Sequence, residues 1–159
     1  MNLADSDEAA TALKFLISSM GGILRSQTIS TWSFSSNTYA PHFSLLPLNL
    51  YFRALLTGIA TFSTHDKPWV RTMSRRVLRA VLTDPVSSLD NGTHPAAKSV
   101  GQYVLTALRS AEGPNASTAI TRLLCLLEGV MHKMPEATFK ELAEFILRLG
   151  AVADPMVRL

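Results

Sequence analysis

The chain has 159 residues with a formal net charge of +3, and 47% of its residues are hydrophobic. This length suits one ordinary domain, and the hydrophobic share favours an ordered core over a disordered or polybasic chain. The single cysteine, Cys125, excludes an internal disulfide framework and fits a reducing compartment. Asp5, Asp7 and Glu8 stand where a secretory signal would be positively charged, so none is predicted.

The N-terminal half predicts three helices. The first covers residues 5–24, where apolar side chains recur at helical spacing, namely Leu13, Leu16, Ile17, Met20, Ile23 and Leu24. Residues 26–44 are rich in Ser, Thr and Asn and predict a loop. A second helix follows over residues 48–63, and Arg53 within this apolar stretch favours a core helix over a membrane span. The third helix is predicted over residues 68–83.

Residues 26–52 do not fit this pattern of regular helices. Within them, the stretch 39–52 is apolar and contains two prolines. One interpretation is a translated retained intron, because Thr38-Tyr39-Ala40 can be encoded with a GTATG donor and Tyr51-Phe52-Arg53 with a TTTCAG acceptor. The other is a divergent loop followed by an early start of the second helix. Both interpretations stay open, and transcript sequencing across the stretch would decide between them.

A fourth helix is predicted over residues 95–110, with Thr93 as its N-cap and a proline in its first turn. Gly101 lies within the apolar stripe of this helix, and we expect a close helix–helix crossing there rather than a break. A fifth helix is predicted to begin at Pro114 or at an Asn115 cap and to end at Lys133.

A sixth helix is predicted from Pro135 to Gly150, with the glycine near its C′ position. Its expected buried stripe is Phe139, Leu142, Ala143, Ile146 and Leu149. Asp154-Pro155 would begin a seventh helix, but the chain stops at Leu159. Because a solenoid that is cut within a repeat lacks its polar cap, we expect a fragment, or an incomplete gene model, of a longer array.

A short phrase occurs twice in the chain. Asp66-Lys67-Pro68-Trp69-Val70-Arg71 returns as Asp154-Pro155-Met156-Val157-Arg158, and Pro114 opens a helical stretch between them. The three prolines recur at the period of HEAT and armadillo repeats, roughly 40–47 residues. Proline suits the first helical position, and aspartate suits the positive end of the helix dipole. The sequence therefore predicts an all-α fold, a HEAT/armadillo-type α-solenoid segment of about six helices in antiparallel pairs, as one unit over residues 1–159.

No residue pattern is typical of a catalytic or metal site. The four histidines are scattered, and none pairs with Cys125 at ligand spacing: His42, His65, His94 and His132. His65 and His94 precede predicted helix starts, which favours a turn or capping role. Cys125 lies in a leucine-rich run, which favours a small core residue over a nucleophile. Since no Gly-rich phosphate loop, nucleophile elbow or close carboxylate pair is present, we predict no enzyme, cofactor, metal or small-molecule substrate.

The third predicted helix carries a cluster of arginines. Arg71, Arg75 and Arg79 are spaced by four and line one side of the helix, with Arg76 on its flank. Arginines crowded on one exposed face predict contact with a nucleic acid or an acidic partner, because guanidinium groups bind phosphate bidentately. The alternative is a solvated face without a partner. Trp69 beside them suits stacking on a base, or packing against the preceding helix.

Four short sequence motifs after His65 occur in the same order as in a known protein family. They are Lys67-Pro68-Trp69-Val70-Arg71, His94-Pro95-Ala96-Ala97 with Lys98-Ser99-Val100-Gly101-Gln102-Tyr103, the stretch from Ala119-Ile120-Thr121-Arg122-Leu123-Leu124 to Met134-Pro135-Glu136, and Asp154-Pro155-Met156-Val157-Arg158. In these residues the chain resembles the N-terminal HEAT-repeat region of the ribosomal RNA-processing protein 12 family, which are large nucleolar assembly factors. The match lies mainly in residues 65–159.

This resemblance implies a nuclear and nucleolar scaffold that acts in ribosomal RNA processing and in small-subunit biogenesis and export. The implied partners are pre-ribosomal RNA and ribosome assembly factors, with shuttling between nucleus and cytoplasm and no membrane. The family has no catalytic residues to carry over. The alternative is a generic HEAT-repeat adaptor or transport-receptor-like module that binds only proteins.

Overall fold

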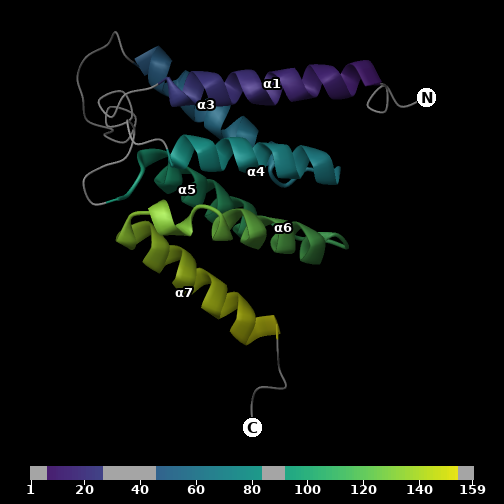
Figure 1. The fold of residues 1–159 in the computed structure, drawn as a ribbon. Helices are drawn as coiled ribbons and strands as arrows, with labels where there is room; N and C mark the ends of the chain where they lie inside the picture. The colour runs from purple at the N-terminus through teal and green to yellow at the C-terminus, as the bar shows by residue number, and fades with distance from the viewer. Residues whose placement is uncertain (1–6, 27–45, 84–91, 154–159) are drawn as a thin grey trace.

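The computed structural model describes residues 7–26, 46–83 and 92–153. This part of the chain contains no strand and folds into six α-helices and one 3-10 turn (Figure 1): α1 (Asp7–Arg25), α3 (Leu46–Phe62), α4 (Pro68–Leu82), α5 (Pro95–Arg109), α6 (Ala116–Glu128), η2 (Met131–Lys133) and α7 (Glu136–Ala153). The all-α prediction is confirmed.

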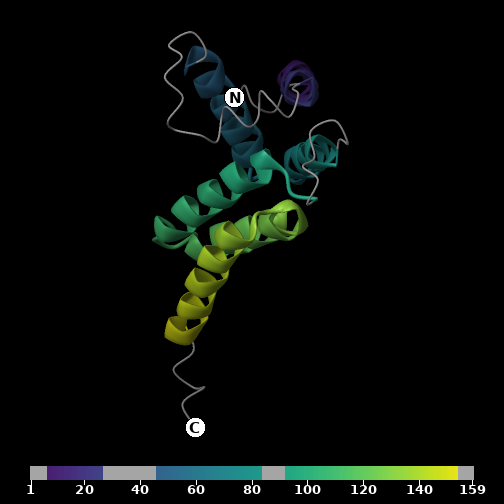
Figure 2. The same ribbon diagram turned by 90° about the vertical axis from the view of Figure 1, so that its left-hand side faces the viewer.

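The helices lie in two layers that extend along one direction. Helices α1, α4 and α6 are stacked one below the other in Figure 1, and α3, α5 and α7 descend beside them in Figure 2. Within the layers α1 packs on α4, α3 on α5, and α5 on α7; between the layers α3 packs on α4, and α5 on α6. Two layers of stacked helices are the arrangement that HEAT-type repeats form.

Apolar side chains from all six α-helices fill the space between the layers in one continuous cluster. Its members include Met20, Leu24, Phe52, Leu56, Ile59, Leu78, Leu82, Val100, Val104, Leu126, Leu127 and Leu142. Each helix contributes through apolar positions three or four residues apart, which share one face. The core is therefore elongated along the row of helices, and each helix depends on its neighbours for burial.

The helices at the two ends of the row keep large apolar side chains in solvent. Phe15 of α1 is 74% exposed and Leu147 of α7 is 72% exposed. Leu16 was predicted in the apolar stripe of the first helix and Phe139 in the buried stripe of the sixth, yet both are exposed. That prediction was wrong because an end helix has a neighbour on one side only, so part of its stripe faces outward.

Two glycines allow neighbouring helices of one layer to come close. A Cβ atom on Gly101 of α5 would lie 2.8 Å from Met134 Cε and 2.9 Å from Thr138 Cγ2 at the start of α7. A Cβ on Gly21 of α1 would lie only 2.2 Å from Val77 Cγ1 of α4. Real Cβ atoms do not approach other atoms so closely, so the packing requires glycine at these positions. The predicted close crossing at Gly101 is confirmed.

The N-cap of α5 is His94 and not Thr93 as predicted. The Ala96 N–H donates to His94 Nδ1 at 3.0 Å, which satisfies one of the amide groups left unpaired at a helix start. The His94 N–H donates in turn to the Lys133 carbonyl at 2.8 Å, and the histidine is buried. The contact with the Lys133 carbonyl fixes His94 as the capping residue, and this tertiary contact cannot be predicted from the local sequence.

Two predicted helix ends were also wrong. Helix α6 ends at Glu128 instead of Lys133, because Gly129 is a weak helix former and residues 131–133 form a tighter 3-10 turn. Helix α7 continues through Gly150 to Ala153, because one glycine costs a helix only about 1 kcal/mol.

Several predictions fall on residues that the structure does not describe. These are most of the loop over residues 26–44, His42 and the seventh helix at Asp154. Helix α3 begins at Leu46, within the stretch assigned two interpretations above, and Phe52 is buried in the core. In the part of the chain that is described, no helix is long and apolar enough to cross a membrane.

Candidate partner-binding surface around helix α4

Helix α4 carries four arginines and no carboxylate. It lies between α1 and α6 in the middle of its layer (Figure 1). Lys67 precedes it in an extended conformation, and Pro68 stands in the first turn, as predicted. The side buried against the core consists of Val70, Ser74, Leu78, Val81 and Leu82. The arginines therefore emerge along the remaining surface of the helix.

Arg71 is half-buried and belongs to the connection between α3 and α4. Its Nη1 donates to the carbonyl oxygens of His65 at 2.8 Å and Asp66 at 2.6 Å. The Lys67 N–H donates to His65 Nδ1 at 3.1 Å, so the turn is also held by the histidine. These bonds satisfy backbone groups near the helix start. The predicted turn or capping roles of His65 and His94 are confirmed.

Arg75 is also half-buried and links the α3–α4 connection to α6. Its Nε donates to the Ser63 carbonyl at 3.1 Å, and its Nη2 donates to the Arg122 carbonyl at 3.2 Å. The expectation that all four arginines of α4 share one exposed face was therefore wrong for Arg71 and Arg75. Both guanidinium groups donate to carbonyl oxygens outside α4, and the spacing of residues along a helix cannot predict such contacts.

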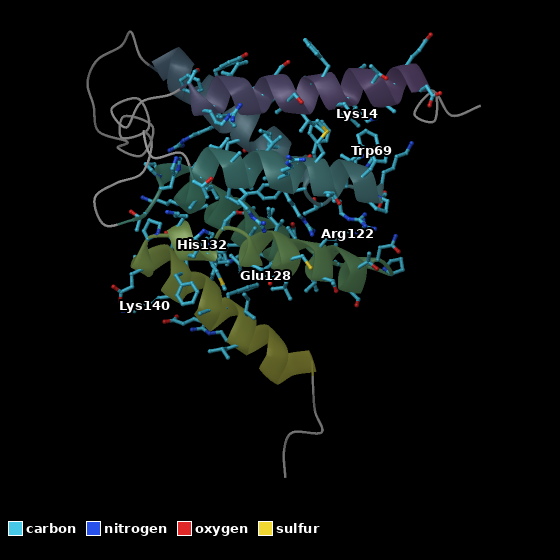
Figure 3. All side chains as sticks on the ribbon, in the orientation of Figure 1. Lys14, Trp69, Arg122, Glu128, His132 and Lys140 are labelled. Carbon is cyan, nitrogen blue, oxygen red and sulfur yellow. The ribbon has the colours of Figure 1, made fainter. Side chains whose placement is uncertain are left out.

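Arg122 on α6 completes this set of contacts. In Figure 3 it lies on the side of α6 that faces α4. Its Nη1 pairs with Asp66 Oδ1 at 2.5 Å and lies 3.4 Å from the Thr64 carbonyl oxygen. The guanidinium of Arg122, hydrogen-bonded to the Asp66 carboxylate, lowers the pKa of that carboxyl below its usual 3.8. The ion pair joins the phrase Asp-Lys-Pro-Trp-Val-Arg to the next helix of the layer.

Asp66→Asn is expected to lower the melting temperature slightly at neutral pH, because the carboxylate is exposed and water screens its ion pair. A lowered pKa in the folded state means that the contribution is present above pH 3.8 and is lost as the pH falls through the folded pKa. The difference in melting temperature between wild type and variant should therefore vanish in acid. Thermal unfolding followed by circular dichroism measures it.

The control for this measurement is Glu144→Gln, because Glu144 lies 3.9 Å from Arg148 in an exposed pair within α7. We expect no measurable change for that variant. An Asp66→Asn effect of the same size at neutral pH and in acid well below pH 3.8 would contradict the assigned role of the ion pair.

Arg76 and Arg79 are exposed, and neither forms an ion pair with the described residues. Arg79 borders a small depression of about 30 Å³ between α4 and α6, together with Arg75, Cys125 and Gly129. Cys125 is exposed there, so the expected core position was wrong. Arg76 lies on the other side of α4, toward α1.

Arg76 lines a groove between α1 and α4 that encloses about 320 Å³. The other residues around it are Ser18, Gly21, Arg25, Met73, Val77 and Ala80. Arg25 and Ser18 had no role in the sequence analysis. Gly21 was the one sequence feature that could have indicated this groove, because a glycine within an apolar stripe suggests that another helix packs closely there. It does not show which helix that is.

The Trp69 ring meets a side chain of α1. Lys14 Nζ of α1 lies 5.5 Å from the centre of the indole ring (Figure 3), a cation–π contact. The ring is half-buried, so one of its faces is not free to stack on a base.

In the described residues no group of three or more histidine, cysteine or carboxylate side chains could hold a metal ion, and His132 is exposed on η2.

Three curated relatives align with the chain. The chain is 24% identical over 163 aligned residues to an RRP12-like protein of Gallus gallus, 21% over 159 to one of Homo sapiens, and 22% over 165 to one of Drosophila melanogaster. The alignments cover 99%, 99% and 93% of the chain. The chain matches a segment of the RRP12-like proteins.

The RRP12-like proteins are much longer than this chain, which spans 11% of the length of each of the three relatives. Because the alignments cover nearly all of the chain, the likeness to RRP12-like proteins is not confined to residues 65–159, where the motifs lie. No family model matches the sequence, and no solved structure matches it.

Proposed function

We propose that the chain is a non-enzymatic scaffold segment that acts in ribosome biogenesis, in ribosomal RNA processing and in small-subunit maturation and export. The observation that carries this proposal is the alignment with RRP12-like proteins over nearly the whole chain. The two-layered row of helices supports it, because such rows offer long surfaces for macromolecules. The proposed location is the nucleus and nucleolus, with shuttling to the cytoplasm, and the proposed partners are pre-ribosomal RNA and assembly factors.

Residues 1–159 form one α-solenoid segment of a longer array in this proposal. The exposed apolar side chains of α1 and α7, such as Phe15 and Leu147, would then pack against neighbouring repeats. Each covered side chain adds hydrophobic stabilisation, so a chain extended by its flanking repeats should unfold at a higher temperature than residues 1–159 alone.

The proposed RNA contacts of α4 divide into two kinds. Arg76 and Arg79 are exposed and have no carboxylate partner in the described chain, so their guanidinium groups can reach phosphate. Arg71 and Arg75 donate to carbonyl oxygens, and we assign them the role of holding α4 in place beside that surface.

Replacing Arg76 and Arg79 together with alanine is expected to weaken binding of a single-stranded ribosomal RNA fragment at every sequence tested. Loss of two phosphate contacts should also reduce the slope of log affinity against log salt by about 1 for each arginine. Fluorescence anisotropy across a salt series measures both quantities. The control is Arg148→Ala, which removes one exposed arginine from another helix, α7. Unchanged affinity and slope in the double variant would exclude α4 as the RNA surface.

The second candidate function is a HEAT-repeat adaptor or transport-receptor-like module that binds only proteins. The groove between α1 and α4 favours it, because an apolar floor with basic walls suits a peptide. Crosslinking in cells separates the two candidates. Ribosomal RNA recovered after ultraviolet crosslinking supports the first, and protein crosslinks without ribosomal RNA support the second.

A further inference from the structure

The groove between α1 and α4 combines an apolar floor with charged walls. Met73, Val77 and Ala80 of α4 form the floor together with Gly21 of α1. The walls are Arg76 on α4 and, on α1, Arg25 and Ser18. Its volume of about 320 Å³ lies within the range typical of binding clefts, which is about 300–1,000 Å³.

The groove exists because its centre lacks large side chains. Gly21 is buried against Val77, where a Cβ atom would collide with the valine, so the two helices are in direct contact at that point. Ala80 and Ser18 are small and leave the space beside this contact open. Met73 is half-buried and unbranched, and methionine adapts its shape to different apolar partners.

The two arginines of the groove lack carboxylate partners in the described chain. Helix α4 contains no acidic residue, and α1 carries its carboxylates, Asp7 and Glu8, in the first turn, at the end opposite Arg25. Two exposed guanidinium groups beside an apolar floor are complementary to carboxylates that flank an apolar anchor. The charges therefore favour an acidic ligand that carries an apolar side chain.

A nucleic acid fits this groove less well than a peptide. Single-stranded RNA is held by aromatic rings on which its bases stack, and the floor has none. Trp69, on the same helix, already faces Lys14. An apolar floor also gains nothing from a phosphate, whereas it can bury a leucine, methionine or phenylalanine side chain.

We propose that the α1–α4 groove is a docking site for an acidic peptide segment of another protein, with an apolar side chain on the Met73–Val77–Ala80 floor and carboxylates on Arg25 and Arg76. The site does not depend on the proposed role in ribosome biogenesis. An apolar anchor with flanking charges is the manner in which amphipathic segments bind grooves between helices.

Selection from a random twelve-residue peptide display library on the wild-type chain tests this proposal. The selected peptides should share one or two large apolar residues flanked by Asp or Glu. By fluorescence anisotropy, synthetic copies should bind at least tenfold more weakly to the Arg25→Glu/Arg76→Glu double variant. Arg148→Glu, which makes the same kind of charge change on α7, should bind as the wild type does.

A second variant tests the apolar part without changing charge. Ser18→Phe places a ring over the floor from an exposed position on α1, so it should block the peptide while the circular dichroism spectrum stays native. The proposal is overturned if no acidic consensus emerges or if both groove variants bind like wild type. It is also overturned if a single-stranded RNA of similar charge binds as tightly as the peptides and is blocked by Ser18→Phe to the same extent, because the apolar floor would then not select a peptide. Arg76 belongs to both proposed surfaces, whereas Arg79 lies outside the groove. RNA binding that Arg79→Ala weakens and Ser18→Phe leaves unchanged supports the ribosomal role and leaves the peptide result intact.

Discussion

Leu78→Ala is expected to destabilise the chain by about 2–5 kcal/mol. Leu78 is 1% exposed on the buried side of α4 and belongs to the continuous core cluster. Its truncation removes apolar contacts and leaves a cavity that the surrounding helices can fill only partly. Because α4 lies between α1 and α6, the loss should affect the whole row.

Urea unfolding followed by circular dichroism measures this loss as a lower midpoint at an unchanged slope. The control is Leu147→Ala on α7, where the leucine is 72% exposed. Since this side chain is already in water, we expect a change within about 0.5 kcal/mol. Comparable losses for the two leucines would show that α4 does not occupy the centre of the packed layers.

Gly21→Ala and Gly22→Ala are expected to change stability in opposite directions. Gly22 is exposed with nothing within 4 Å of an added Cβ, so alanine should stabilise α1 by up to about 1 kcal/mol through helix propensity. At Gly21 the added Cβ would lie 2.2 Å from Val77 Cγ1. Overpacking of this kind costs about 1–3 kcal/mol, which exceeds the gain in propensity.

Chemical unfolding of the two variants side by side provides the comparison, because the substitutions are identical and adjacent in one helix. The double variant Gly21→Ala/Val77→Ala identifies the cause, since it removes the colliding methyl group. We expect it to be more stable than the sum of the two single changes predicts. Parallel gains for both glycine variants would mean that α1 and α4 do not touch at Gly21.

Most helices of this protein could be predicted because their signals are local. Pro68 occupies the first turn of α4, and the repeated apolar spacing places α1, α5 and α7 close to their observed positions. The errors lie at ends and caps. His94 replaces Thr93 as a cap because of its contact with the Lys133 carbonyl, and α7 passes through Gly150 because one glycine is a weak stop.

The candidate surface was predicted only in part, since periodicity shows which residues share a side of a helix but not what lies against that side. The arginines of α4 were identified from their spacing. The structure separates them: Arg75 donates to Ser63 and Arg122, whereas Arg76 stays exposed beside Arg25. Arg25 belongs to a helix separated from α4 by more than forty residues of chain, so no local pattern could have joined the two.

The amino-acid sequence by itself determined that this chain is helical, that its helices are amphipathic and that they recur at a repeat-like period, because these properties arise from backbone propensity and residue spacing. The tertiary structure alone decided which helices become neighbours. It placed Gly21 against Val77, paired Asp66 with Arg122, and formed a groove from Arg25 and Arg76. Such features depend on the distance between segments that are remote in the chain, and that distance is set only when the layers pack.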